Sequence, residues 1–97
     1  LIDRFTISAG ERAVMAFDVL PNVLLVGEIT NGGQGTQIGR ELANGWFYTL
    51  VTQKVELANG QSYEGIGLAP DVEMKNTPEE INAGVDRVLQ YAIEELK

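Results

Sequence analysis

One serine in this sequence has the surroundings of a nucleophile. Ser8 stands in the segment TISAGERAV, between a stretch rich in β-branched residues and a stretch whose apolar residues recur at helical spacing. A serine at such a junction can expose its hydroxyl, and the first N–H groups of the helix, beginning with Ala9, can stabilise an oxyanion. The same serine can instead cap the helix, with Glu11 as its capping-box partner. Local spacing leaves both roles open.

The residues that usually accompany a catalytic serine are scarce. The sequence contains no histidine and no cysteine, so a histidine base for Ser8 must come from outside these 97 residues. Without cysteine there are no disulfides, thiolate nucleophiles or zinc–thiolate sites. The acids lack calcium-loop spacing, and TNGGQGTQ lacks the Gly-Lys-Ser/Thr ending of a phosphate loop. We therefore predict no metal site and no cofactor.

Composition limits the class of protein further. The chain has 97 residues, 44% hydrophobic residues and a formal net charge of −7, which predicts one folded domain rather than a disordered segment. No cluster of lysine and arginine is available to neutralise phosphates, which argues against a nucleic-acid partner. No apolar run is long enough to span a bilayer, so we predict no membrane insertion by this segment.

The elements that position Ser8 follow from the hydrophobic pattern. Residues 1–7 have the composition of a strand, residues 10–20 have apolar positions at helical spacing, and residues 23–30 open with a continuous apolar run typical of a buried strand. This order predicts a strand–helix–strand unit with parallel strands and a right-handed crossover. The following segment, NGGQGTQIG at 31–39, is glycine-rich and predicts a loop.

The second half of the chain predicts hairpins and a helix. The segment ELANG occurs at 41–45 and again at 56–60, and Asn-Gly favours hairpin turns in an antiparallel extension of the sheet. Residues 77–97 read as one helix, with Thr77 and Glu80 as a capping box and Pro78 at the first helical position. Its apolar stripe, which is predicted to face the sheet, comprises Ile81, Val85, Val88, Leu89, Ala92 and Leu96. The predicted fold class is therefore α/β.

Several segments together resemble one family. TISAGE is similar to the nucleophile motif T-x-S-A-x-E of the S41 serine peptidases, the tail-specific or C-terminal processing proteases. VLLVGEITNGGQG is similar to their V-G-E-x-T-x-G-x-G segment, and YEGIGLAPDVEM to their G-I-x-P-D-V motif; ELANGWFYTL and the closing helix also fit, in the same order. The resemblance implies a ClpP/crotonase-like fold with Ser8 as the nucleophile. It also implies an oxyanion hole made by the Ala9 N–H and a second donor upstream of Leu1.

The sequence departs from the lysine-dependent branch of this family. In that branch a lysine on the glycine-rich segment activates the serine, whereas the matching position here falls at Gly33 or an adjacent residue, and residues 13–39 contain no lysine or arginine. This resembles the branch of the tricorn proteases and the interphotoreceptor retinoid-binding protein repeats, in which an upstream histidine is the base. By the same resemblance Glu64 orients the catalytic group; by composition alone it is a strand-end surface acid. Glu11 is a candidate supporting residue.

These observations give a set of functional expectations. Because the chain starts with Leu1 in what reads as mid-strand, we expect residues 1–97 to be the C-terminal portion of an S41-like catalytic domain that is inactive alone and completed by its upstream half. The parent is expected to be a bacterial, extracytoplasmic enzyme that hydrolyses peptides or proteins through an acyl-enzyme on Ser8. The alternative is a non-catalytic peptide- or ligand-binding module. Apolar surface left uncovered would favour self-association of the fragment.

Overall fold

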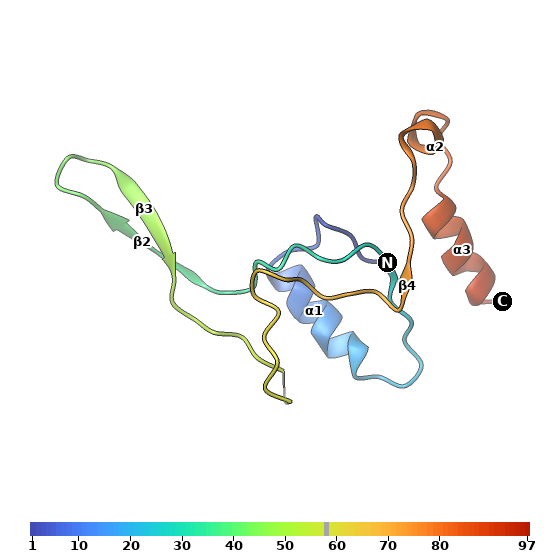
Figure 1. Ribbon diagram of the computed structural model, residues 1–97, viewed down its shortest axis with the longest axis horizontal. Helices are drawn as coiled ribbons and strands as arrows, with labels where there is room; N and C mark the ends of the chain where they lie inside the picture. The colour runs from blue at the N-terminus through green and yellow to red at the C-terminus, as the bar shows by residue number, and fades with distance from the viewer. Residues whose placement is uncertain (58) are drawn as a thin grey trace.

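The computed structural model describes residues 1–57 and 59–97. The elements, in chain order, are α1 (Ala9–Asp18), β1 (Val26–Gly27), β2 (Gln37–Glu41), β3 (Phe47–Val51), β4 (Val72–Glu73), α2 (Pro78–Asn82) and α3 (Arg87–Glu95). Figure 1 shows α1 in the middle, the β2–β3 hairpin projecting to one side, and α2 and α3 at the opposite end. The predicted α/β class is confirmed.

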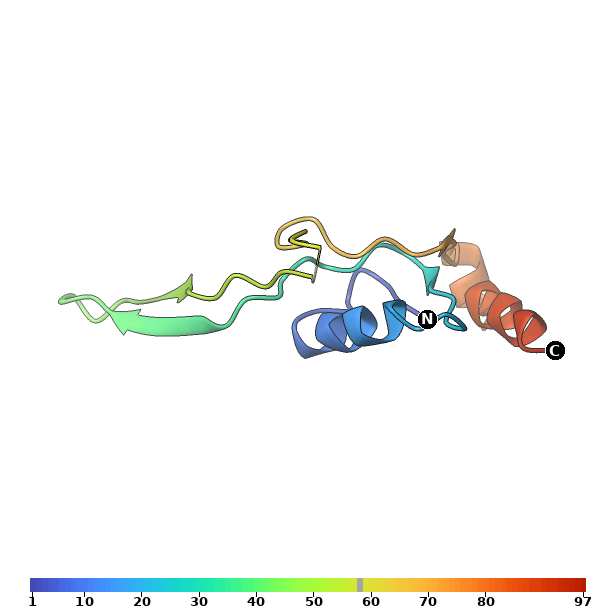
Figure 2. The same cartoon turned by 90° about the horizontal axis from the view of Figure 1, so that it is seen from below.

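The molecule is elongated. It extends over 57 × 37 × 15 Å, and its radius of gyration is 17.0 Å, whereas a compact chain of this length has a radius of about 12–13 Å. Viewed from below in Figure 2, the hairpin continues away from the body without folding back onto α1. The hairpin therefore contributes little to the central core.

A small parallel sheet lies beside α1. Strand β1 pairs with β4, with Val26 opposite Val72, and Ile2 adds an isolated parallel bridge to Gly27. Of the strand predicted over residues 1–7, only this bridge at Ile2 is present, so the prediction was wrong for the rest of the segment. The Asp3 carboxylate accepts the backbone N–H groups of Phe5 (2.9 Å) and Thr6 (3.0 Å), and this side-chain turn takes the chain away from the sheet.

The core is formed between α1 and the parallel segments. The helix predicted over residues 10–20 is confirmed as α1, which buries Val14 and Glu11. The buried apolar cluster consists of Ile2, Val14, Leu25 and Leu68, against which Met15, Val23 and Tyr63 pack. The core thus joins the helix that starts at Ser8 to the segments on either side of the hairpin.

The first predicted hairpin is confirmed. Strands β2 and β3 are antiparallel, with Gln37 opposite Val51 and Glu41 opposite Phe47, and the turn places Gly45 at φ 82°. However, this hairpin forms its own two-stranded sheet instead of extending the parallel one. The glycine-rich segment that precedes β2 carries the chain away from the body, so the expected extension of one sheet was wrong.

The second predicted hairpin is only a turn in the described residues. The Leu57 N–H donates to the Gln61 carbonyl at 2.9 Å, and Gly60 has φ 80°. Among the described residues no strand flanks this turn. Ala58, which belongs to the predicted motif, lies outside the described residues. Isolated hairpins need cross-strand side-chain pairs for stability. The short polar run from Gln61 onward supplies few of them.

The predicted C-terminal helix begins as expected but is broken in two. The Glu80 N–H donates to Thr77 Oγ1 (3.2 Å) and the Thr77 N–H to Glu80 Oε2 (2.7 Å), so the capping box is confirmed. Gly84 then takes φ 69° and ends α2. Asp86 starts α3 by accepting the Leu89 N–H at 3.0 Å. A glycine is costly inside a helix and free to take a left-handed conformation, which explains the break.

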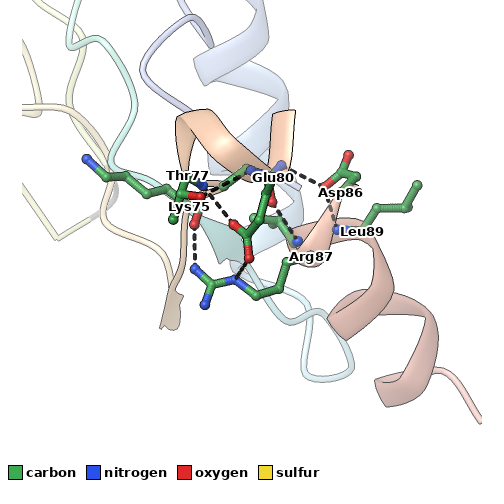
Figure 3. A network of polar contacts seen from close by, with 8 residues as sticks. Lys75, Thr77, Glu80, Asp86, Arg87 and Leu89 are labelled. Atoms are coloured by element: carbon green, nitrogen blue, oxygen red, sulfur yellow. Dashed lines mark hydrogen bonds and ion pairs between the residues drawn. The ribbon is translucent and has the colours of Figure 1, made fainter. Parts of the chain in front are cut away.

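Polar contacts tie the two C-terminal helices to the end of β4. The Arg87 guanidinium donates to the Lys75 carbonyl at 2.7 Å and pairs with the Glu80 carboxylate at 3.4 Å, as Figure 3 shows. The predicted apolar stripe does not face the sheet as a whole, since Ile81 is 64% and Leu96 is 88% exposed. Helix α3 lies against β1. Among the described residues, no helix is long and apolar enough to cross a membrane.

Candidate active site

Ser8 is held in an unusual backbone conformation. It lies at the sharp turn into α1 with φ 56° and ψ −113°, and among the described residues it is the one non-glycine residue with positive φ. Such a conformation costs roughly 1–3 kcal/mol and persists only where the surrounding contacts impose it. Ser8 is exposed to solvent. A strained turn at the start of a helix can present a serine hydroxyl to solvent.

The geometry argues against a simple capping role for Ser8. An ordinary N-cap has an extended backbone and a side-chain oxygen bonded to the first turn. Ser8 and Glu11 occupy the positions of a capping box, but the Ser8 side chain makes no capping hydrogen bond. The half of the box that forms is the one from Glu11, whose Oε2 accepts the Ser8 N–H at 3.1 Å. The serine hydroxyl is therefore left for other partners.

The helix N-terminus offers a donor beside Ser8. Ala9 is the first residue of α1, and its N–H donates to no acceptor among the described residues, whereas the next N–H, of Gly10, is bonded to the Ile7 carbonyl at 3.0 Å. The first N–H groups of a helix have no intrahelical acceptor and carry the positive end of the helix dipole. This is where an oxyanion donor is predicted, and the Ala9 N–H remains a prediction for that role.

Glu11 is the most constrained polar side chain near Ser8. It is fully buried, with 0% exposure. Besides the Ser8 N–H, its carboxylate accepts the Thr30 hydroxyl and the Gly32 N–H, each at 2.6 Å. Hydrogen bonds to an ionised acceptor are among the stronger ones in proteins. Glu11 therefore joins the turn at Ser8 to the segment that follows β1.

Thr30 continues this connection to a third segment. Its hydroxyl oxygen accepts the Leu68 N–H at 2.7 Å, and its backbone N–H donates to the Leu68 carbonyl at 3.0 Å. Thr30 is 3% exposed, so losing either bond would leave a buried polar group unpaired. Sequence reasoning missed Thr30; its available signal was its place directly before the glycine-rich loop.

The glycine-rich loop packs against the serine turn. The Gly33 carbonyl accepts the Ser8 N–H at 3.0 Å, and a Cβ at Gly33 would lie 3.0 Å from Ile7 Cδ1. Gly33, at or next to which the resemblance predicts the position of the family lysine, therefore lies beside Ser8. Gly32, at φ 84°, lies so close to the segment 65–67 that a Cβ would come within 2.8 Å of the Gly67 nitrogen. Glycine is required there by both conformation and space.

Glu64 is brought to the same loop rather than to Ser8 itself. One carboxylate oxygen, Oε2, accepts the N–H groups of Gln34 at 3.0 Å and Gly35 at 2.9 Å. The residue is exposed, and it makes no hydrogen bond with Ser8 in the described structure. Glu64 therefore fastens the glycine-rich loop, and its role in orienting a base stays a prediction.

Gln34 is a second residue that sequence reasoning missed. It is fully buried, and among the described residues its side-chain amide makes no hydrogen bond. Its carbonyl accepts from the Arg12 guanidinium at 3.2 Å. A polar residue within a glycine-rich stretch gives no pattern from which burial can be inferred. Together Gln34, Glu64 and Arg12 hold the loop that lies beside Ser8.

Among the described residues, neither a group of metal-ligating side chains nor the groove described next is found at Ser8. Within residues 1–57 and 59–97, no group of three or more histidine, cysteine, aspartate or glutamate residues could hold a metal ion. A groove of about 520 Å³ runs between residues 1–6 and the start of the C-terminal helices, lined in part by Phe5, Met74 and Ile81. Ser8 does not line this groove, so the groove is not the candidate active site.

These features define a class of protein: an α/β domain in which a strained serine begins a helix and two carboxylates fasten a glycine-rich loop beside it. Comparison with known proteins is more specific, since residues 1–74 match the model of peptidase family S41. The chain belongs to this family, and the sequence resemblance is confirmed. No curated protein matched the chain.

Two solved structures are similar over almost the whole chain. A presumed peptidase from Parabacteroides merdae ATCC 43184 is 34% identical, with a TM-score of 0.86 over 97% of this chain and 30% of its own. The tricorn protease is 28% identical, with a TM-score of 0.75 over 96% of this chain and 9% of its own. The chain therefore spans less than a third of either structure.

Proposed function

We propose that this chain carries the nucleophile of a serine-type peptidase and that Ser8 forms an acyl-enzyme with the substrate. The observation that carries the proposal is the strained, exposed conformation of Ser8, maintained by the buried Glu11 carboxylate. Membership of peptidase family S41 supports a peptidase as the parent protein. Backbone strain without an evident structural benefit is a recognised sign of a functional site.

In the proposed mechanism the Ser8 oxygen attacks the carbonyl carbon of a peptide bond. A base takes the hydroxyl proton and later delivers it to the leaving amine, and water then releases the acyl group. The Ala9 N–H stabilises the oxyanion together with a second donor from another part of the parent protein. Because residues 1–97 contain no histidine and the loop beside Ser8 has no lysine, the base also comes from elsewhere in that protein.

Glu64 is proposed to orient this base, directly or through another hydroxyl. Its Oε2 atom holds the loop, whereas Oε1 accepts no hydrogen bond among the described residues. One carboxylate could thus fasten the loop and receive a donor from the base at the same time. Gly33 is proposed to leave room beside Ser8 where the other branch of the family places a lysine.

The wider assignment rests on the same proposal. Residues 1–97 would form the C-terminal portion of the catalytic domain, inactive until the upstream half supplies the base and the second oxyanion donor. The substrate would be a peptide or protein, cleaved internally or near its C-terminus, and the parent a bacterial, extracytoplasmic enzyme. These statements follow from the resemblance to the tail-specific and C-terminal processing proteases.

A non-catalytic binding module of the same fold is the second candidate. The observation that favours it is the exposed apolar surface of the hairpin, where Trp46 is 73% and Phe47 is 69% exposed. Exposed apolar patches of this kind mark binding or association surfaces. They would also allow the isolated segment to associate with itself.

Fluorophosphonate labelling of the full-length protein, with mass-spectrometric mapping of the modified residue, tests the proposal. The chain contains two serines, Ser8 and Ser62, so Ser8→Ala is the test variant and Ser62→Ala the matched control. Labelling at Ser8 that survives Ser62→Ala and is absent from residues 1–97 alone would support a nucleophile completed by other parts of the protein. A folded parent that is not labelled would favour the binding module.

A further inference from the structure

We propose that Glu11 is a positioning residue whose buried negative charge stabilises the protonated form of the base that activates Ser8. This inference rests on the proposed function, because it assigns a role to Glu11 in that reaction. The base is taken to be a neutral nitrogen base supplied by another part of the parent protein. When the Ser8 oxygen bonds to the substrate carbon, its proton moves to that nitrogen, which becomes a cation.

The first observation is an imbalance of charge. Glu11 is fully buried, yet in residues 1–57 and 59–97 no lysine or arginine forms an ion pair with it. Buried carboxylates are normally paired with a cation or bound to a metal. Glu11 instead relies on hydrogen bonds from Ser8, Thr30 and Gly32. A buried anion in this state favours any positive charge that forms nearby.

The second observation is the set of donors around the Glu11 carboxylate. The N–H groups of Ser8 and Gly32 can only donate, and the Thr30 hydroxyl also donates to Glu11. All three groups thus use the carboxylate oxygens as acceptors. Among the described residues, the carboxylate of Glu11 is held in place by donors alone, without a cation.

The third observation is proximity. Glu11 Oε2 lies 3.1 Å from the backbone nitrogen of Ser8. The Ser8 hydroxyl is on the same residue, separated from that nitrogen by Cα and Cβ. A base within hydrogen-bond reach of that hydroxyl lies no more than roughly 9 Å from the Glu11 carboxylate. At that separation and an effective dielectric constant near 20, the Glu11 charge raises the pKa of the base by roughly one unit. The effect is smaller where solvent penetrates between the two groups.

Other charges surround the site and remain unchanged in the test. Arg12 donates to the Gln34 carbonyl, and Glu64 is bonded to the loop amides. On the segments that pack around Glu11 (residues 1–18, 23–35 and 63–71), the other charged groups are Asp3, Arg4, Arg12, Asp18, Glu28, Glu64 and Asp71. Because each is retained when Glu11 alone is changed, the difference between variant and wild type reports the charge of Glu11.

The test is the pH dependence of Ser8 modification by a fluorophosphonate in the full-length protein, comparing wild type with Glu11→Gln and Glu11→Asp. If the charge acts on the base, Glu11→Gln lowers the midpoint of the acid limb by about half a unit to one unit, because the cationic base is then less stable. Glu11→Asp keeps the charge, so its midpoint stays within about 0.2 units of wild type even if its rate falls. A slower Glu11→Gln enzyme with an unmoved midpoint would overturn the proposal and leave a purely structural role.

Thr30→Val decides the matter if Glu11→Gln does not fold. The Thr30 hydroxyl donates to Glu11 and its positive end offsets part of the carboxylate charge. Thr30→Val removes that donor, so the base is exposed to a more negative field and the midpoint moves to higher pH, with Thr30→Ser as the control that retains the hydroxyl. An unmoved midpoint in folded Thr30→Val would overturn the proposal. Failure of the proposed function itself looks different, because wild-type Ser8 would then not be labelled at any pH.

Discussion

The backbone N–H of Ser8 points to the carbonyl of Gly33, 3.0 Å away, while the same N–H also reaches the Glu11 carboxylate at 3.1 Å. The serine turn is thus held from two sides, by its own helix and by the glycine-rich loop. This relationship explains how a non-glycine residue is kept at φ 56°. It also means that the strain at Ser8 can be measured separately from its chemistry.

Replacing Ser8 with glycine should stabilise the protein while abolishing fluorophosphonate labelling. Glycine adopts positive φ without the steric cost that a side chain carries, so Ser8→Gly should be more stable than Ser8→Ala by about 1 kcal/mol. Urea denaturation of the two variants measures the difference. Equal stabilities, or a more stable alanine variant, would show that the serine turn is not strained.

Gly67 and Gly65 should respond very differently to alanine. Both have positive φ, but a Cβ at Gly67 would overlap the Thr30 carbonyl oxygen, whereas at Gly65 there is open space. We expect Gly67→Ala to cost about 3 kcal/mol or more and Gly65→Ala about 1 kcal/mol. Denaturation midpoints compare the pair, and similar losses would show that the contact between Thr30 and Gly67 is looser than described.

Removing the Glu64 side chain should loosen the glycine-rich loop more than the rest of the fold. In Glu64→Ala the N–H groups of Gln34 and Gly35 lose their shared acceptor, so their amide hydrogen exchange should speed up by about tenfold. Core amides such as that of Leu25 should change little. The exposed Glu79→Ala serves as control, and uniform acceleration at all amides would contradict a local clamp.

The start of α3 should weaken in acid through Asp86. Hydrogen bonds from the Asn76 side chain and then from the Leu89 N–H lower the pKa of Asp86 below its ordinary value of 3.8. Because the folded-state pKa is the lower one, the stabilisation is present above about pH 4 and is lost as the pH falls through the folded-state value. NMR of the Leu89 amide between pH 6 and 2 tests this.

The matched variant for this effect is Asp86→Asn. Asparagine caps a helix about as well as aspartate but does not titrate in this range. The difference in α3 stability between wild type and variant should therefore change below pH 4. A constant difference down to pH 2 would show that the Asp86 contacts do not favour the charged form.

Several features could be predicted from the sequence because they depend on near neighbours. The helical spacing after Ser8, the Asn44-Gly45 turn and the Thr77 capping box each involve residues a few positions apart, whose hydrogen bonds form largely independently of the remaining fold. The order of the motifs was also enough to indicate peptidase family S41. Pattern alone could not show that a glycine would divide the last helix at Gly84.

The tertiary structure alone determined how the site is put together. The Ser8 turn, Thr30 and Gly32 meet through the carboxylate of Glu11, across sequence separations of up to 21 residues, and Glu64 reaches Gln34 across 30. Neither the positive φ of Ser8 nor the burial of Glu11 has a local signature, because both depend on what packs against them. The capping-box pattern therefore identified Ser8 and Glu11 as a pair. Only the packing of the glycine-rich loop explains why Ser8 is strained and why the Glu11 carboxylate is buried.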